Sequence, residues 1–220
     1  MTTSAVLFDM DGVLVDSASL HVRAYERVFR DAGIEFPAAA RNAVHEGKRR
    51  ADVIEIAAPD ASSAVGQALF DAKPAAVAQV LRDAANVSMP GASRLVRALA
   101  DRGIPMGVVT NSVDAELWLA AAEILDVMDV LITGNDVSSP KPAAEGYLLA
   151  AERLGVLPTA CIVIEDSRDG WLAASRAGMR VLVLASARPA WADESVELVP
   201  SMDSPRVLAL CLRGTTGDAS

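Results

Sequence analysis

The chain has 220 residues, of which 52% are hydrophobic and 4% aromatic, and its formal net charge at pH 7 is −9. This length is enough for one large core, or for a large core and a small one. The acidic charge excludes a general attraction to nucleic acid or to an anionic membrane, so an anionic ligand would need a local cation, a lysine or helix N-termini.

The first predicted element is a short buried strand over residues 4–8. The apolar run ends at Asp9, and Asp11 and Gly12 follow directly. Two carboxylates at the end of a buried strand are costly to desolvate unless they are paired, hydrogen-bonded or bound to a metal. Residues 5–17 therefore predict the chemical centre of the protein.

Residues 17–88 carry helical patterns and no strand pattern. The predicted helices cover residues 17–32, 37–45, 53–58, 64–69 and 75–85. Gly33 and Pro59 are typical helix stops. Pro74 separates the last two helices, so Lys73 before it is expected to be extended.

From residue 89 onward, strands and helices alternate. The predicted strands cover residues 104–109, 130–133, 161–164, 180–184 and 196–199. The predicted helices cover residues 92–101, a stretch around 117–125, a stretch opened by residues 140–142, a stretch up to Ala177, and residues 206–212. This alternation predicts an α/β fold, a doubly wound parallel sheet with helices on both faces.

The helical stretch after the first strand is too long for an ordinary connection between a strand and a helix. We therefore expect two domains. Residues 1–16 and 89–220 would form the α/β catalytic core, and residues 17–88 would form an inserted all-helical cap domain.

Reactive side chains follow several predicted strands, and ligands bind at the carboxyl ends of the strands in open parallel sheets. In chain order they are Asp9 and Asp11, then Thr110, Asn111 and Ser112, then Lys141 just inside a helix start, then Glu165 and Asp166. The carboxylates would repel one another unless a divalent cation lay among them, and Mg²⁺ binds carboxylates together with phosphate. One carboxylate could then attack phosphorus while another transfers the proton, and the hydroxyl and the lysine could hold the phosphoryl group.

Four short motifs resemble those of the haloacid dehalogenase-like superfamily. They are DMDGVLVDS from residue 9, TNS from residue 110, SPKP from residue 139 and IEDSRDG from residue 164. The first motif, the fourth motif and the helical insertion are similar to the sugar-phosphatase and β-phosphoglucomutase branch. An aspartate at position 11 argues against a dehalogenase, because cleavage of a carbon–halogen bond needs no proton donor there.

The resemblance implies a role for each core residue. Asp9 would be the nucleophile and Asp11 the general acid and base. Mg²⁺ would be held by Asp9, the main-chain oxygen of Asp11 and Asp166, with Glu165 helping through water. The phosphoryl group would be held by Thr110 and Lys141 and lined by Asn111 and Ser112.

The resemblance also extends to the cap. His21 falls where β-phosphoglucomutases have a histidine near the hinge, and residues 47–50 resemble their Gly-x-x-Arg loop. Gly47 and Arg50 would then belong to a substrate-binding loop in which Arg50 contacts a distal phosphate, and Lys73 is a further candidate. Glu46 stands where the mutases commonly have lysine, which favours a hydrolase over a mutase.

Each candidate also has a structural interpretation. Asp9 and Asp11 could be solvated turn residues, and the segments 110–112 and 165–167 could be helix caps. The basic residues and His21 could lie on solvated faces. Four motifs in this order favour function instead.

We therefore predict a Mg²⁺-dependent phosphatase that acts on a small phosphorylated metabolite, with a sugar phosphate favoured. The first alternative is a β-phosphoglucomutase-like phosphotransferase, and a remote one is a non-catalytic phospho-acceptor signalling module. Cys161 and Cys211 show neither metal-binding nor disulfide spacing, and no secretion signal or membrane-spanning run is visible. We expect a cytoplasmic monomer or small homo-oligomer with no nucleic-acid or membrane partner.

Overall fold

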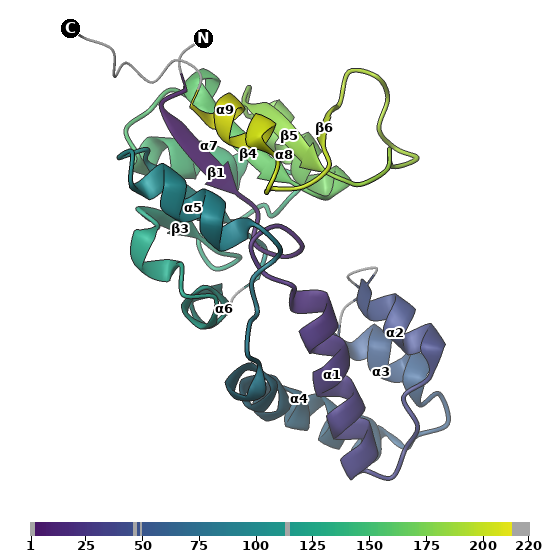
Figure 1. Ribbon diagram of the computed structural model, residues 1–220. Helices are drawn as coiled ribbons and strands as arrows, with labels where there is room; N and C mark the ends of the chain where they lie inside the picture. The colour runs from purple at the N-terminus through teal and green to yellow at the C-terminus, as the bar shows by residue number, and fades with distance from the viewer. Residues whose placement is uncertain (1–2, 46–47, 49, 113–114, 213–220) are drawn as a thin grey trace, which may run out of the picture. The chain divides into compact units, whose positions relative to one another are not determined.

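The computed structural model describes residues 3–45, 48, 50–112 and 115–212 (Figure 1). The chain divides into two compact units. We call Met1–Val15 with Ser88–Ser220 the core unit, and Asp16–Val87 the helical unit. No helix in the described ranges is long and apolar enough to cross a membrane.

The core unit contains a six-stranded sheet in the order β3-β2-β1-β4-β5-β6, and neighbouring strands are parallel. The strands are β1 (Ala5–Phe8), β2 (Met106–Val109), β3 (Val130–Ile132), β4 (Cys161–Glu165), β5 (Arg180–Leu184) and β6 (Glu197–Val199). Every residue of β1, β2 and β4 is buried, as expected for central strands covered on both faces. The predicted α/β class with a doubly wound parallel sheet is confirmed.

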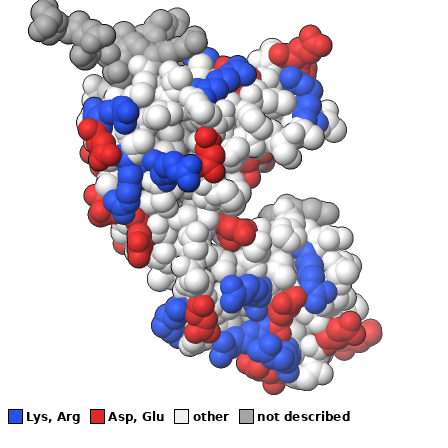
Figure 2. Space-filling model, viewed as in Figure 1, with Lys and Arg blue, Asp and Glu red and all other residues white. Residues whose placement is uncertain are grey.

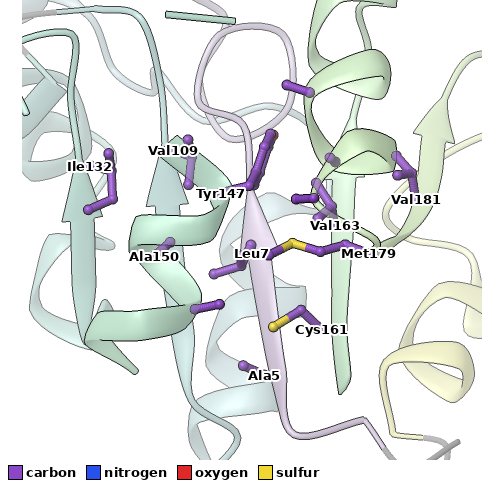
Figure 3. Close-up of a cluster of buried hydrophobic side chains, with 14 of the residues drawn as sticks. Ala5, Leu7, Val109, Ile132, Tyr147, Ala150, Cys161, Val163, Met179 and Val181 are labelled. Carbon is purple, nitrogen blue, oxygen red and sulfur yellow. The ribbon is translucent and has the colours of Figure 1, made fainter. Parts of the chain in front are cut away.

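Helices cover both faces of this sheet, with α5 and α9 in front and α7 and α8 behind in the view of Figure 1. The core-unit helices are α5 (Ala92–Ala100), α6 (Ala115–Ala121), α7 (Glu145–Arg153), α8 (Arg168–Arg176) and α9 (Pro205–Cys211), with short 3-10 helices at Leu125–Val127 and Pro158–Ala160. Alternate strand residues such as Leu7 and Val163 pack against Tyr147 and Ala150 of α7 (Figure 3).

Two predictions about core-unit helices are wrong. Residues 140–142 do not open a helix, because α7 begins at Glu145. Lys141 precedes a proline, which disfavours the helical conformation, so this lysine lies in a turn rather than inside a helix start. The helical pattern around residues 117–125 is also interrupted: α6 ends at Ala121, and Glu123 has a positive φ of 56°.

The helical unit consists of α1 (Ser17–Asp31), α2 (Ala38–His45), α3 (Arg50–Ala57) and α4 (Ser63–Asp83). Side chains cap the N-termini of α1 and α4. Asp16 accepts a hydrogen bond from the Ser19 amide, and Ser62 accepts one from the Val65 amide. Basic and acidic side chains are interspersed on the face shown in Figure 2. Among the ion pairs of this unit, Arg27 lies 3.6 Å from Asp83. Exposed pairs of this kind contribute little to stability.

The predicted break between helices at 64–69 and 75–85 is wrong, because α4 runs as one helix through Pro74. A proline inside a helix cannot donate to the carbonyl four residues earlier, here that of Phe70. Arg50 Nη1 donates to this carbonyl oxygen at 3.3 Å, and the guanidinium lies 4.6 Å from the centre of the Phe70 ring. Lys73 is consequently helical and not extended, and the Phe70 carbonyl has a side-chain donor in place of the amide that Pro74 lacks.

Candidate active site

The carboxyl ends of β1, β2 and β4 bring the predicted core residues together. Because β1 lies between β2 and β4 in a parallel sheet, residues that follow these three strands meet at one edge. The ladder continues one residue past β1, where the Asp9 amide donates to the Ile164 carbonyl at 3.0 Å. The Asp9 side chain is thereby held beside Glu165, at the end of β4.

Lys141 links the two carboxylates at this edge. Its Nζ atom lies 2.5 Å from Asp9 Oδ1 and 2.6 Å from Glu165 Oε1, and its side chain is 8% exposed. Burial favours the neutral amine, but the charges of Asp9 and Glu165 outweigh it and raise the pKa of Lys141. Lys141 is therefore an ammonium ion beside Asp9.

Glu165 is completely buried and its two oxygens are occupied. The Tyr147 hydroxyl donates to Oε1 at 2.8 Å, and Oε2 accepts from the Asp166 amide, the Ser167 amide and the Ser167 hydroxyl at 3.1, 3.3 and 3.1 Å. A Cβ atom on Gly170 would lie 1.7 Å from Oε1, so this position requires glycine. The first turn of α8 thus closes over the Glu165 carboxylate.

The acidic side chains of this edge form a group that could hold a cation. Asp9, Glu165 and Asp166 offer oxygens that lie within 4.8 Å of one another. Burial raises the pKa of Asp9 well above its usual value, with Glu165, Asp11 and Asp166 adding to the rise and Lys141 opposing it. Burial, followed by the charge of Glu165, raises the pKa of Asp166 to about 7. Lys141 alone does not balance these charges, and hard oxygen ligands fit a divalent cation such as Mg²⁺.

A glycine shapes the turn after β1. Gly12 has a φ of 77°, which side chains rarely adopt, and a Cβ atom there would lie 2.0 Å from Asp166 Oδ2. The turn can therefore approach the Asp166 carboxylate closely.

The TNS segment after β2 contacts both neighbouring segments. The buried Thr110 hydroxyl lies 3.5 Å from Asp11 Oδ2 and accepts a hydrogen bond from the Ser112 amide at 3.1 Å. Asn111 Oδ1 accepts from the main-chain amide of Lys141 at 3.1 Å. Asn111 therefore fixes the turn that carries Lys141, a contact that its predicted role of lining a phosphoryl group does not include.

The helical unit brings two of its predicted residues together. Lys73 Nζ lies 3.0 Å from His21 Nδ1 and 4.2 Å from the centre of the Tyr25 ring, and Lys73 is only 3% exposed. Burial, together with the nearby Arg50, lowers the pKa of Lys73 to about 7. Burial and the charges of Lys73 and Arg50 lower the pKa of His21 to about 3. His21 Nδ1 and Lys73 Nζ are thus hydrogen-bond partners within the helical unit.

The other predicted cap residues differ in their contacts. Arg50 engages the main chain and ring of Phe70, as described above for α4. Gly47 and Glu46 lie outside the described residues. Gly47 therefore stays a prediction.

Tyr147 is a part of this site that the sequence analysis missed, although a tyrosine among apolar helix positions needs a partner for its hydroxyl when it is buried. Ser167 lies within the IEDSRDG motif, where its type suits a helix cap. It caps α8 by accepting from the Gly170 amide at 3.0 Å and also binds Glu165.

Comparison with known proteins places this site in a family. Residues 3–178 match the family model described as haloacid dehalogenase-like hydrolase. The chain is 36% identical over 177 residues to validoxylamine A 7'-phosphate phosphatase of Streptomyces hygroscopicus subsp. limoneus, a match that covers 79% of this chain and 81% of the relative.

Two further relatives match this chain over similar fractions of its length. The chain is 30% identical over 223 residues to β-phosphoglucomutase of Mycobacterium bovis, with 88% of this chain and 85% of that protein covered. It is 30% identical over 179 residues to fructose-1-phosphate phosphatase of Escherichia coli, with 80% of this chain and 93% of that protein covered. With its parallel sheet and the acidic edge around Lys141, the chain belongs to the haloacid dehalogenase-like hydrolases.

Proposed function

We propose that the chain is a Mg²⁺-dependent phosphatase that hydrolyses a small phosphorylated metabolite, a sugar phosphate by class, through an aspartyl-phosphate on Asp9. The observation that carries the proposal is the ion pair of Asp9 with Lys141 at 2.5 Å, set between further carboxylates at the carboxyl edge of the sheet. Family membership and the names of two phosphatase relatives support a phosphoric monoester hydrolase.

The reaction would have two steps. A carboxylate oxygen of Asp9 attacks phosphorus, the ester bond breaks, and Asp11 gives its proton to the leaving oxygen. Asp11 then takes a proton from water, whose oxygen attacks phosphorus, and the bond from Asp9 to phosphorus breaks to release phosphate. Thr110 lies 3.5 Å from Asp11, which places a hydroxyl beside the acid and base.

The donors at this edge would bind the phosphoryl group and the cation. Thr110 and Lys141 would hold the phosphoryl oxygens, and Asn111 and Ser112 would line the group. Asp9, the main-chain oxygen of Asp11 and Asp166 would hold Mg²⁺, with Glu165 helping through water. Bound there, the ion would supply positive charge to the phosphoryl oxygens.

We further propose that the helical unit is the cap domain predicted over residues 17–88. The cap would bind the part of the substrate beyond the phosphoryl group. Lys73 is buried, and none of the carboxylates in the described ranges forms an ion pair with it. When it is protonated, a buried amine without a paired carboxylate favours binding of an anionic or hydroxyl-rich group. Lys73, His21 and Arg50 would form that site, and Gly47 stays a candidate from the sequence resemblance.

A screen of phosphate release tests the proposal. Sugar phosphates, phosphoglycolate and nucleoside monophosphates would be incubated with the protein, with and without Mg²⁺. We expect release from at least one sugar phosphate and only in the presence of Mg²⁺. No release from any ester, together with no phosphorylated protein, would contradict the proposal.

The β-phosphoglucomutase relative keeps a second candidate open. A mutase would need a bisphosphate and would isomerise a sugar phosphate without net release of phosphate. A signalling module would instead accumulate phosphorylated protein with no turnover. The same screen, read by sugar-phosphate analysis and by the mass of the intact protein, separates these outcomes.

A further inference from the structure

We propose that Tyr147 is a positioning residue for the reaction, which sets the place of the Lys141 ammonium through Glu165 and through its own ring. The proposal rests on the proposed function of the core-unit site and deepens it. Tyr147 is in α7, is 0% exposed and lies at the end of the buried cluster near the tip of β1 (Figure 3).

Tyr147 contacts both members of an ion pair. Its hydroxyl donates to Glu165 Oε1 at 2.8 Å, the oxygen that also accepts from Lys141 Nζ at 2.6 Å. The Lys141 ammonium lies 5.1 Å from the centre of the Tyr147 ring, within the range of a cation–π interaction. The Tyr147 side chain thus contacts both the Glu165 carboxylate and the Lys141 ammonium.

A side chain at the start of α7 ties the segment before Lys141 to the helix that carries Tyr147. The Glu145 carboxylate, at the start of α7, accepts from the Ser138 and Ser139 amides at 2.9 Å each. The turn that carries Lys141 is therefore tied to the helix that carries Tyr147.

The hydroxyl matters because Lys141 is shared between two carboxylates. The hydrogen bond from Tyr147 makes Glu165 Oε1 a weaker acceptor for Lys141. It also fixes the orientation of the Glu165 carboxylate. Without that bond, Glu165 would draw Lys141 more strongly to itself, and the ammonium would move away from Asp9. The nucleophile would then lose the group that orients it.

The test is Tyr147→Phe, which keeps the ring and removes the hydroxyl. Because one hydrogen bond to a charged group is lost, we expect kcat to fall about tenfold. We expect KM to change by no more than about twofold, since the ring and the other phosphoryl contacts remain. The melting temperature is measured alongside to show that the variant is folded.

A matched control separates positioning from packing. Cys161→Ala alters the same buried cluster at its opposite end (Figure 3), so it should lower stability while kcat stays within about twofold. The Glu165→Gln background supplies a further check, because the hydroxyl acts through the Glu165 charge. There, Tyr147→Phe should cost no more than about twofold in kcat.

Two results would overturn the proposal. One is an unchanged kcat in Tyr147→Phe while the wild-type protein turns over, and the other is an equal loss in the Glu165→Gln background. Inactive wild-type protein would contradict the proposed function instead. Crystal structures test the inference independently of activity. Lys141 should lie within hydrogen-bond distance of Asp9 in the wild type but not in Tyr147→Phe. An unmoved Lys141 would refute the inference.

Discussion

At the scale of single residues, Asp9 is defined by its contact with Lys141 and by its place one residue beyond β1. Asp9→Asn removes the carboxylate that we propose as the nucleophile and keeps the size of the side chain. We expect phosphate release to fall by at least about a thousandfold, because an amide does not form the phosphoenzyme. Phosphate release and the mass of the acid-quenched protein measure this, and full activity would refute the mechanism.

Asp11→Asn provides the matched comparison at the neighbouring carboxylate. It removes the proposed proton donor and base but leaves the proposed nucleophile, so turnover should fall about 10²–10⁴-fold. With p-nitrophenyl phosphate, whose leaving group needs no proton, phosphorylated protein should accumulate. Failure to form it with this ester would assign Asp11 to some other role.

Lys73 carries a second residue-scale prediction, on pH dependence. The pKa of Lys73 in the folded state, about 7, lies below the usual 10.5. The buried charge of protonated Lys73 therefore lowers the free energy of unfolding at pH 7. Because the unfolded chain keeps that proton up to its own pKa, the penalty is full below pH 7 and fades as the pH rises toward 10.5. Within the described part of the chain, the groups that face Lys73 are His21, Tyr25 and Arg50.

Lys73→Met should therefore stabilise the protein, and by on the order of 2 kcal/mol more at pH 7 than at pH 9.5. Urea unfolding at both pH values measures this difference. The control is Arg82→Met, which removes an exposed cation from the same helix and should show no such trend. An equal effect of Lys73→Met at both pH values would contradict a depressed pKa.

At the scale of elements, α4 continues through Pro74, and Arg50 donates to the Phe70 carbonyl that the proline leaves without its helical donor. Arg50→Ala leaves the Phe70 carbonyl without this donor and should lower the free energy of unfolding by about 1 kcal/mol. In the Pro74→Ala background the main chain regains an amide for that carbonyl, so the same substitution should cost less. Equal costs in both backgrounds would show that Arg50 does not compensate for the proline.

The same variants compare two roles for Arg50. A contact to the distal phosphate of a substrate would raise KM in Arg50→Ala whether or not Pro74 is present. A purely structural contact to α4 would leave KM near its wild-type value once Pro74→Ala has restored the helix. Steady-state kinetics on the substrate from the screen distinguish the two.

At the scale of the whole molecule, the proposed cation site belongs to one unit. Asp9, Glu165 and Asp166 all come from the core unit. Bound Mg²⁺ should therefore raise the melting temperature of the protein relative to EDTA by about a few degrees, and EDTA should abolish phosphate release. Differential scanning calorimetry with and without Mg²⁺ measures the shift.

Asp166→Asn should remove most of this Mg²⁺ shift. Asp169→Asn is the control, because Asp169 is an exposed acid in the first turn of α8 and should keep the shift. If both variants respond to Mg²⁺ like the wild type, the cation binds elsewhere.

The sequence by itself determined the class of the fold and the residues at the strand ends. An apolar run that ends at Asp9 is a local pattern, and so is the alternation of strands and helices after residue 89. Such patterns follow from burial, which acts on neighbouring residues through the periods of strands and helices. In a parallel sheet, strand ends meet at one edge, so the proximity of Asp9, Glu165 and Asp166 could be expected.

Only the tertiary structure decided the partners of these residues. Asp9 and Lys141 are 132 positions apart, and Tyr147 reaches Glu165 from a helix on the sheet face. The Phe70 carbonyl beside Pro74 likewise finds a donor in Arg50, which is 20 positions earlier in the chain. Local propensity cannot predict such contacts, because they arise when distant segments pack and their polar groups find hydrogen-bond partners away from water.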